Sequence, residues 1–377
     1  MKRILILGAG SIQVPVIVRC KELSFYTIVA DFDEQAPGLK FADETYIVST
    51  NDKEGILEIA KKSQVDGILT TSDYPVNVVA YVSKELGLSS MSEETAKICT
   101  NKYLQREFLK ENGFKHPEFH CVDSLEGIDR LCKFPYIVKP VDSSASRGVR
   151  KVNSREELID QFEIARSNSR SGKVIVEEFI EGKEYSVETF SQYGKHYVVQ
   201  ITEKLIIGEE AGYFVEDTHI EPALLTDGEK EKIEKTVCDI LSKMKVDNCP
   251  THTELKINPD GIFIIETACR LGGDYITSDL VPLSTGVDML GNLIKVSLGL
   301  EVEVYTSRNK ISAVQFLNDR NYDRCVSFIK RKDPSVVRYE IYSYDKHQIK
   351  SSTDRLGYII LNTESRSGMN EILAQIK

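Results

Sequence analysis

Apolar and polar positions alternate in a regular way over the first hundred residues of the chain. Three short apolar runs predict β-strands: Arg3–Leu7, Tyr26–Ala30 and Val65–Thr70. Between them apolar residues recur at helical spacing, as in Val76–Leu86, a segment that Pro75 opens and Gly87 closes. Strands that alternate with helices predict a parallel sheet, so residues 1–100 are expected to form a Rossmann-like α/β domain.

After residue 100 the pattern becomes mixed, which is typical of an α+β arrangement. Apolar spacing predicts helices at Asn101–Asn112, Glu156–Arg166, Gly228–Met244, Val287–Leu298 and Met369–Ile376. Strands are expected at Tyr136–Val138, Val174–Glu177, Tyr185–Phe190 and Tyr197–Thr202, the last two joined at the Tyr193-Gly194 turn. The tail from Glu303 mixes short strands with the final helix, and it could complete the preceding domain or form a small subdomain.

Composition excludes several classes of protein. The 377 residues carry a net charge of −10, and no basic stripe is present that would suit a nucleic-acid partner. The eight cysteines form no Cys-x-x-Cys pair, which excludes zinc-ribbon spacing. With no signal peptide and no run of membrane-spanning length, we expect a cytoplasmic protein with no membrane partner.

The most informative stretch is an acidic hairpin around Pro259-Asp260-Gly261, a strong turn signal. If this loop has three residues, Glu254 faces Glu266 at a Cβ separation of about 4.5–5.5 Å. Leu255, Ile257, Phe263 and Ile265 then form the core face. Two facing carboxylates repel each other unless a divalent cation lies between them, and their hard oxygens suit Mg²⁺.

The hairpin alone leaves two interpretations open, since a register shift of one residue would turn both glutamates toward water. Strand periodicity also places Ala268 and Arg270 on the same face as Glu266. Arg270 would then extend its guanidinium toward whatever the metal holds, and Gly272-Gly273-Asp274 would follow as a tight backbone segment.

Two further segments carry candidate chemistry. Lys139 ends an apolar strand beside the small-residue loop 143–148, an arrangement suited to phosphate, although in isolation a surface lysine is the more common outcome. The segment Glu177–Glu184 begins at a strand end and can offer main-chain groups to an adenine edge, with Glu184 spaced to reach a ribose. A charged linker is the alternative for this second segment.

Taken in order, these segments resemble the ATP-grasp superfamily. The resemblance rests on Asn101-Lys102, Val138-Lys139-Pro140, the small-residue loop, Glu177–Gly182 with Glu184, then Glu254 and Glu266 followed by Arg270 and two glycines. It implies a Rossmann-like domain (residues 1–100), an ATP-grasp lid (101–185), an ATP-grasp core (186–302) and a C-terminal extension or subdomain (303–377). The carboxylate–amine ligase branch, which includes folds akin to the carbamoyl-phosphate synthase large chain, is the most similar.

The resemblance also implies a role for each matching residue. Lys102 and Lys139 would bind ATP phosphates, covered by the loop with Ser143, Ser146 and Gly148. Glu177, Glu178, Phe179 and Ile180 would contact adenine, and Glu184 the ribose. Glu254 and Glu266 would hold Mg²⁺ or Mn²⁺, while the catalytic candidates Arg270 and Lys139 would act on the transferring phosphoryl group. Lys204, the third catalytic candidate, would approach either phosphate or substrate. Many family members have Asn where this chain has Ala268, so the second metal position is expected to be reduced.

The expected reaction joins a small-molecule carboxylate to an amine through an acyl phosphate, and a homodimer is the expected assembly if the chain associates. Candidate substrate contacts are Asp73, His219, Arg270, Gly273 and Asp274, with His219 expected in a solvent-facing loop. Two alternatives stay open. Gly8-Ala9-Gly10 with Asp31 could form a dinucleotide site of an NAD(P)-linked oxidoreductase, although Gln13 replaces the third glycine. A nucleotide-binding module without turnover is the other.

Overall fold

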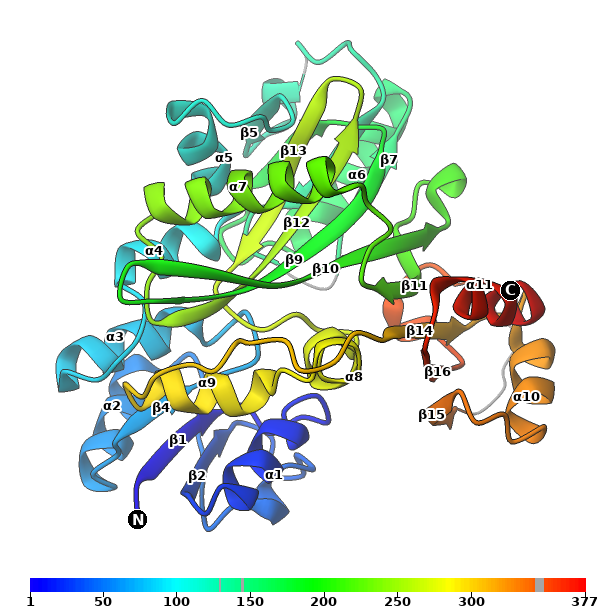
Figure 1. Ribbon diagram of the computed structural model, residues 1–377. Helices are drawn as coiled ribbons and strands as arrows, with labels where there is room; N and C mark the ends of the chain where they lie inside the picture. Colours follow the sequence, from blue (N-terminus) through cyan, green and yellow to red (C-terminus); the bar gives the residue numbers. More distant parts are fainter. Residues whose placement is uncertain (129, 144–145, 343–348) are drawn as a thin grey trace.

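A computed structural model describes residues 1–128, 130–143, 146–342 and 349–377. Figure 1 shows the chain passing from an amino-terminal α/β domain, through a small sheet at the far end, to a large central sheet. The first sheet is four-stranded and parallel, the second four-stranded and antiparallel, and the third eight-stranded and antiparallel. The predicted combination of α/β and α+β architecture is confirmed.

The first sheet has the strand order β3-β2-β1-β4. Its elements are β1 (Arg3–Leu7), α1 (Val14–Glu22), β2 (Tyr26–Asp31), β3 (Glu44–Ile47), α2 (Lys53–Lys62), β4 (Gly67–Leu69) and α3 (Val76–Leu86). The predicted strands and the helix Val76–Leu86 are confirmed within three residues at each end. Strand β3 was not predicted, because its side chains alternate between half-buried and exposed and so form no apolar run.

Two helices, α4 (Glu93–Cys99) and α5 (Lys102–Glu111), lead to the second sheet. That sheet has the order β5-β8-β6-β7 and one covering helix, α6. The bounds are β5 (Phe119–Val122), β6 (Tyr136–Pro140), β7 (Arg150–Val152), α6 (Arg155–Ser167) and β8 (Val174–Glu178). Side chains of α6, including Leu158 and Phe162, bury the apolar face of this sheet.

The large sheet has the order β13-β12-β9-β10-β11-β14-β16-β15. Its strands are β9 (Lys183–Gln192), β10 (Lys195–Ile207), β11 (Val215–Glu221), β12 (Cys249–Asn258), β13 (Gly261–Ala268), β14 (Ile311–Leu317), β15 (Val336–Ile341) and β16 (Gly357–Thr363). The helices are α7 (Asp227–Lys243), α8 (Val281–Thr285), α9 (Met289–Ser297), α10 (Tyr322–Lys330) and α11 (Arg366–Ile376), with a π-helical turn at Ile276–Leu280. Short 3-10 turns lie at Leu39–Phe41, Leu125–Ile128, Glu209–Ala211 and Ser352–Asp354.

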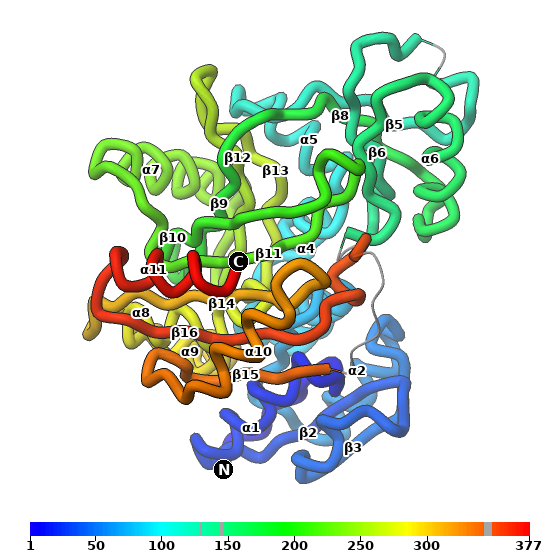
Figure 2. Tube along the Cα trace, turned by 90° about the vertical axis from the view of Figure 1, so that its right-hand side faces the viewer, coloured from blue at the N-terminus to red at the C-terminus, as the bar shows by residue number. Residues whose placement is uncertain are grey.

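The C-terminal extension, residues 303–377, adds its three strands to the large sheet. Strand β14 pairs with β11, and β16 and β15 follow in the same sheet, as Figure 2 shows below β11. Helices α10 and α11 cover one face of these strands through a shared apolar cluster. The extension therefore has no separate sheet of its own in the described residues.

No helix among the described residues is both long enough and apolar enough to cross a membrane.

Candidate active site

The hairpin β12–β13 brings the two predicted metal ligands face to face. Glu254 is the direct cross-strand partner of Glu266, as the sequence predicted. The predicted turn was wrong, however, because Asn258 pairs with Gly261 and leaves only two residues in the loop. The Asn258 carboxamide oxygen accepts hydrogen bonds from the backbone N–H groups of Asp260 and Gly261, at 2.9 and 3.3 Å. These bonds favour the shorter loop.

A β-bulge reconciles the shorter turn with the correct glutamate pair. The register shifts between Glu254 and Leu255, so that Ile265 is the extra residue between two regular stretches of ladder. As a consequence Ile262 and Ile264 lie in the core, while Phe263 and Ile265 are only half-buried. The prediction that Phe263 and Ile265 form the core face was therefore wrong.

Each glutamate of the pair also faces a lysine from another element. Lys204 Nζ on β10 lies 2.5 Å from Glu254 Oε1, and Lys102 Nζ on α5 lies 3.0 Å from Glu266 Oε1. Burial alone would raise the pKa of Glu254, but Lys204 and then His252 outweigh it, so this pKa lies well below its usual range. The glutamate is thus held ionised.

The second carboxylate oxygens of Glu254 and Glu266 suit a hard cation. In the described part of the chain, Glu254 Oε2 and Glu266 Oε2 accept no hydrogen bond, and both side chains are about a quarter exposed. No cluster of three or more His, Cys, Asp or Glu side chains among these residues is arranged to hold a metal ion alone. Two carboxylates with open positions fit Mg²⁺, which normally completes its shell with water and phosphate oxygens. Ala268, buried opposite His252, adds no ligand.

A buried cationic pair lies beside this site. Lys139 Nζ is 2.7 Å from Glu177 Oε2, and Arg106 Nε is 2.8 Å from Glu177 Oε1. Burial, and the neighbouring cations Arg106 and Lys102, lower the pKa of Lys139. The Glu177 carboxylate is therefore occupied by two cations, so an adenine contact by this residue would have to come from its main-chain atoms. Arg106 was missed by sequence reasoning, because a lone arginine on a helix gives no signal of its distant partner.

The predicted phosphate loop begins next to the glutamate pair. The Ser143 carbonyl accepts a hydrogen bond from Lys102 Nζ at 2.9 Å. Ser146 and Gly148 both have positive φ, 53° and 71°. Residues 144 and 145 of this predicted loop lie outside the described residues.

The predicted adenine segment 178–182 borders an open groove with residues 257–260 on its other side. Phe179 and Ile180 are buried, and the Lys151 ammonium lies 3.8 Å from the Phe179 ring centroid. Phe214 lies 6.2 Å from Phe179, centroid to centroid, and was not predicted. Glu184, the predicted ribose ligand, lies 3.1 Å from Lys204, and its burial raises its pKa.

Arg270 and Asp73 come together although they lie 197 residues apart in the sequence. Arg270 Nε and Nη2 donate to the two carboxylate oxygens of Asp73 at 2.7 and 3.2 Å, a forked pair. Burial alone would raise the pKa of Asp73, but the guanidinium outweighs it and lowers this pKa. The pair connects the end of the first sheet to the segment that follows Glu266.

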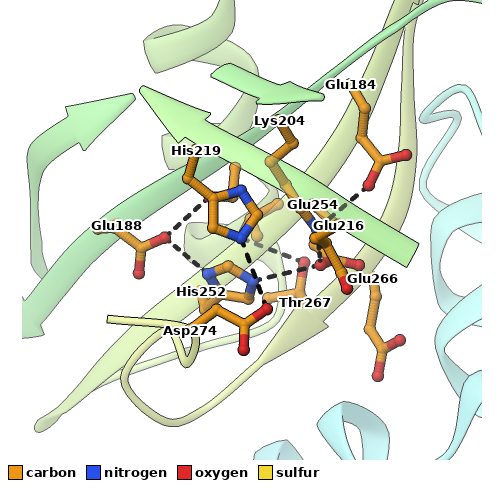
Figure 3. Close-up of polar contacts among 12 residues, drawn as sticks. Glu184, Glu188, Lys204, Glu216, His219, His252, Glu254, Glu266, Thr267 and Asp274 are labelled. Carbon is orange, nitrogen blue, oxygen red and sulfur yellow. Dashed lines mark hydrogen bonds and ion pairs between the residues drawn. The ribbon is translucent and has the colours of Figure 1, made fainter. Parts of the chain in front are cut away.

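The remaining substrate candidates are His219, Gly273 and Asp274. Figure 3 shows His219 and Asp274 pointing toward each other, with His219 Nε2 3.6 Å from Asp274 Oδ2. The prediction that His219 lies in a solvent-facing loop was wrong, because it is on β11 between β10 and β14 and is 1% exposed. Gly273 has open space around the position of a Cβ atom. Arg355, which contacts Asp274, was not predicted, because it lies 81 residues away in the sequence.

Another residue that sequence reasoning missed is His252. Its Nδ1 lies 2.6 Å from Glu188 Oε1 and its Nε2 3.4 Å from Glu254 Oε1, so the ring stands between a buried carboxylate and a metal-ligand candidate (Figure 3). Burial would lower the pKa of His252, but Glu188 and Glu254 raise it to about 9. The alternation of His252 with Glu254 on one strand face was the available signal.

The glycine turn of the first domain does not offer a dinucleotide site. Asp31, the expected ribose ligand, accepts hydrogen bonds from the backbone N–H groups of Ala9 and Asp33 at 2.6 and 2.9 Å. The Gln13 side chain lies close against Gly8 and Gly10, where a pyrophosphate would approach. Both observations favour a structural role for this turn.

Two family models match the chain. One, described as an ATP-grasp domain, matches residues 132–279, and one described as a PylC-like N-terminal domain matches residues 4–89. The chain is 30% identical over 186 residues to the formate-dependent phosphoribosylglycinamide formyltransferase of Methanocaldococcus jannaschii. The matched region covers 47% of this chain and 48% of that protein. It is 25% identical over 303 residues to the alanine–anticapsin ligase of Bacillus subtilis (strain 168), covering 73% and 63%. The matches thus span about half to two thirds of these relatives.

Solved structures share the fold over the whole chain. The L-amino acid ligase from Bacillus licheniformis matches with a TM-score of 0.83 at 21% identity, covering 100% of this chain and 98% of that one. The N5-carboxyaminoimidazole synthetase from Staphylococcus aureus complexed with ADP matches with a TM-score of 0.80 at 15% identity, covering 100% and 97%. At these identities the likeness shows the fold alone.

Proposed function

We propose that this chain, whose residues 132–279 match an ATP-grasp domain and whose residues 4–89 match a PylC-like N-terminal domain, joins a carboxylate to an amine with consumption of ATP. The single observation that carries the proposal is the facing pair Glu254 and Glu266, each beside a lysine. The name of one relative, the alanine–anticapsin ligase, favours an amino acid as one substrate.

The proposed reaction has two steps. A carboxylate oxygen attacks the γ-phosphorus of ATP, the bond to the bridging oxygen breaks, and ADP leaves. The amine nitrogen then attacks the acyl carbon, phosphate leaves with the bonding electrons, and the nitrogen loses its proton. Catalysis of this kind depends on positioning and on neutralising charge.

The chain supplies these two functions through separate groups. Glu254 and Glu266 would hold Mg²⁺, which when bound offsets the charge of the phosphates. Lys102 and Lys139 would contact phosphate oxygens, and Arg270, held in orientation by the Asp73 fork, would stabilise the transferring phosphoryl group. Lys204 holds Glu184 and Glu254 together.

Nucleotide and substrate would bind on two sides of the glutamates. Main-chain atoms of Glu177 and of residues 178–180 would contact adenine, and Glu184 the ribose. The loop with Ser143, Ser146 and Gly148 would cover the phosphates. Asp73, His219, Gly273 and Asp274 would line the substrate side, away from the nucleotide.

The substitution Glu266→Gln tests the proposal. It keeps the shape of the side chain but removes its charge, so we expect ADP release in a screen of amino-acid pairs to fall roughly 100-fold. Mg-ADP should bind at least tenfold more weakly, while metal-free ADP binds as before. Glu340→Gln, on the exposed strand β15, is the matched control.

Two outcomes would contradict the proposal. Undiminished ADP release in Glu266→Gln would remove this glutamate from the site. A wild-type protein that binds Mg-ATP but releases no ADP with any pair would instead support the nucleotide-binding module without turnover.

A further inference from the structure

The segment that follows Arg270 has a strained backbone. Asp274 and Tyr275 are consecutive residues with positive φ, 50° and 65°, and a π-helical turn at Ile276–Leu280 follows directly. A side chain as bulky as tyrosine rarely adopts this conformation, which persists only where neighbours hold it. We refer to residues 272–280 as the strained segment.

The strained segment borders the metal-ligand candidates. A Cβ atom on Gly272 would lie 2.8 Å from both Glu188 Oε2 and His252 Nδ1, so its backbone is in close contact with this ion pair. His252 in turn approaches Glu254. The Glu188–His252 pair thus lies between the strained segment and Glu254.

One arginine of the C-terminal extension holds the first half of the strained segment. Arg355 Nη1 and Nη2 donate to the two carboxylate oxygens of Asp274 at 3.0 and 2.8 Å. The guanidinium also donates to Glu216 on β11 and lies 3.5 Å from the centroid of the Phe316 ring. With 9% of its side chain exposed, Arg355 is fixed on several sides.

A second arginine of the extension holds the other half. Arg338 on β15 lies 3.0 Å from Asp279 and is placed over the Tyr275 ring, 5.1 Å from its centroid. The Tyr275 ring also stacks on Tyr358 of β16, with centroids 4.1 Å apart. Two arginines from one extension thus contact two acidic residues of one strained segment, and both also contact aromatic rings.

We propose that the C-terminal extension is a clamp in which Arg355 and Arg338 hold the strained segment in its unfavourable backbone conformation and so position Asp274 at the substrate side of the site. Both are positioning residues, since they act through Asp274 and Asp279. The proposal rests on the proposed function in one respect, that Asp274 borders the carboxylate or amine.

The variants Arg355→Lys and Arg338→Lys test the clamp. Lysine keeps the positive charge but replaces the planar fork by a single ammonium. We expect backbone amides of residues 274–280 to exchange with deuterium about fivefold faster or more in each variant, with little change in the rest of the large sheet. Arg338 is nearly half exposed, so its variant remains informative if Arg355→Lys fails to fold.

Arg366→Lys is the matched control. Arg366 belongs to the same extension and also forms an ion pair, with Glu203, but it does not contact the strained segment. It should leave exchange at residues 274–280 unchanged. Equal acceleration in this control, or no acceleration in either clamp variant, would overturn the proposal.

A second measurement separates positioning from general loosening. In both clamp variants Mg-ADP should bind within twofold of the wild-type affinity. If the amino-acid screen yields a substrate pair, the KM of one partner should rise about tenfold, and Asp274→Asn should reproduce that rise. Weakened Mg-ADP binding would overturn the clamp. The exchange experiment requires no turnover, so failure of the ligase proposal would be recognised separately.

Discussion

At the scale of single residues, the site depends on buried charges that are paired but not fully neutralised. Glu177 lies between Lys139 and Arg106, so the three side chains together carry one net positive charge. Burial strengthens the field of such a charge, and a phosphate is the natural partner for it. The same pairing explains why a lysine can be held in the interior at all, since an unpaired buried charge is very costly.

Replacing the Glu177 carboxylate should show how far the stability of the protein depends on this ion pairing. Glu177→Gln leaves two buried cations without an anion, so we expect the free energy of unfolding to fall by about 3–5 kcal/mol at pH 7. Urea titration measures the change, and Glu178→Gln, at the exposed neighbouring position, is the control for stability. A loss below 1 kcal/mol would show that the pair contributes little.

The pH dependence of that loss has a defined sign. The pKa of Glu177 is lowered, because Arg106 and then Lys139 outweigh the effect of burial. Its stabilisation is therefore present above the ordinary glutamate pKa of 4.5 and is lost as the pH falls through the lowered value. The difference between wild type and Glu177→Gln should shrink at pH 4.

At the scale of elements, close contact between strands sets the geometry of the nucleotide groove. Gly182 begins the turn into β9 with a φ of 148°, and a Cβ atom there would lie 2.5 Å from the Ile257 carbonyl oxygen on β12. The glycine allows segment 178–182 to approach the hairpin that carries Glu254. The β-bulge in this hairpin keeps Glu266 directly opposite Glu254, so that both carboxylates lie on the same face of the hairpin.

A side chain at Gly182 should therefore act on both stability and binding. Gly182→Ala is expected to push the groove open and to weaken Mg-ADP binding at least tenfold. Gly194→Ala is the matched control, because Gly194 also has positive φ, 70°, but has no heavy atom within 4 Å of a Cβ. Its variant should lose only about 1 kcal/mol of stability from backbone strain and bind Mg-ADP normally. Equal binding in the two variants would refute the role of the close contact.

At the scale of the whole molecule, the helices of the first domain do not by themselves cover both faces of the first sheet. Helices α2 and α3 bury one face, whereas on the other face α1 shares an apolar cluster with α9. Figure 1 shows α9 lying across the first domain, although it comes some 200 residues later in the chain. Ile4 and Ile6 of β1 belong to that shared cluster, together with Met289 and Ile294.

The isolated fragment 1–100 should consequently fail to fold cooperatively. Without α9 the face that carries Ile4 and Ile6 is exposed to water, and a domain of this size has little stability to spare. Near-ultraviolet circular dichroism and urea unfolding of the fragment, beside the full chain, measure this. A sharp transition in the fragment would contradict the expectation.

Much of the fold followed from the sequence because it depends on local periodicity. Examples are the apolar runs of β1 and β2 and the helix Val76–Leu86, which is bounded by Pro75 and Gly87. The buried residues of such elements recur at the spacing of a strand or a helix, so the sequence alone reveals them. The lysines and glutamates of the site were identifiable for a similar reason, since their order along the chain resembles that of a known superfamily.

What the sequence determined by itself was therefore the type of most elements and the order of the motifs. The pairing of Glu254 with Glu266 was one of two interpretations that the hairpin left open, and the register of β12 and β13 decided it. The tertiary structure decided which charged side chains are buried and which partners they contact. It placed Arg106 against Glu177, His219 inside the sheet, and Arg355 on Asp274. It also set the bulge at Ile265, which compensates for a turn one residue shorter than predicted. These outcomes depend on contacts between residues far apart in the chain, whose energies leave no periodic trace in the sequence around either partner.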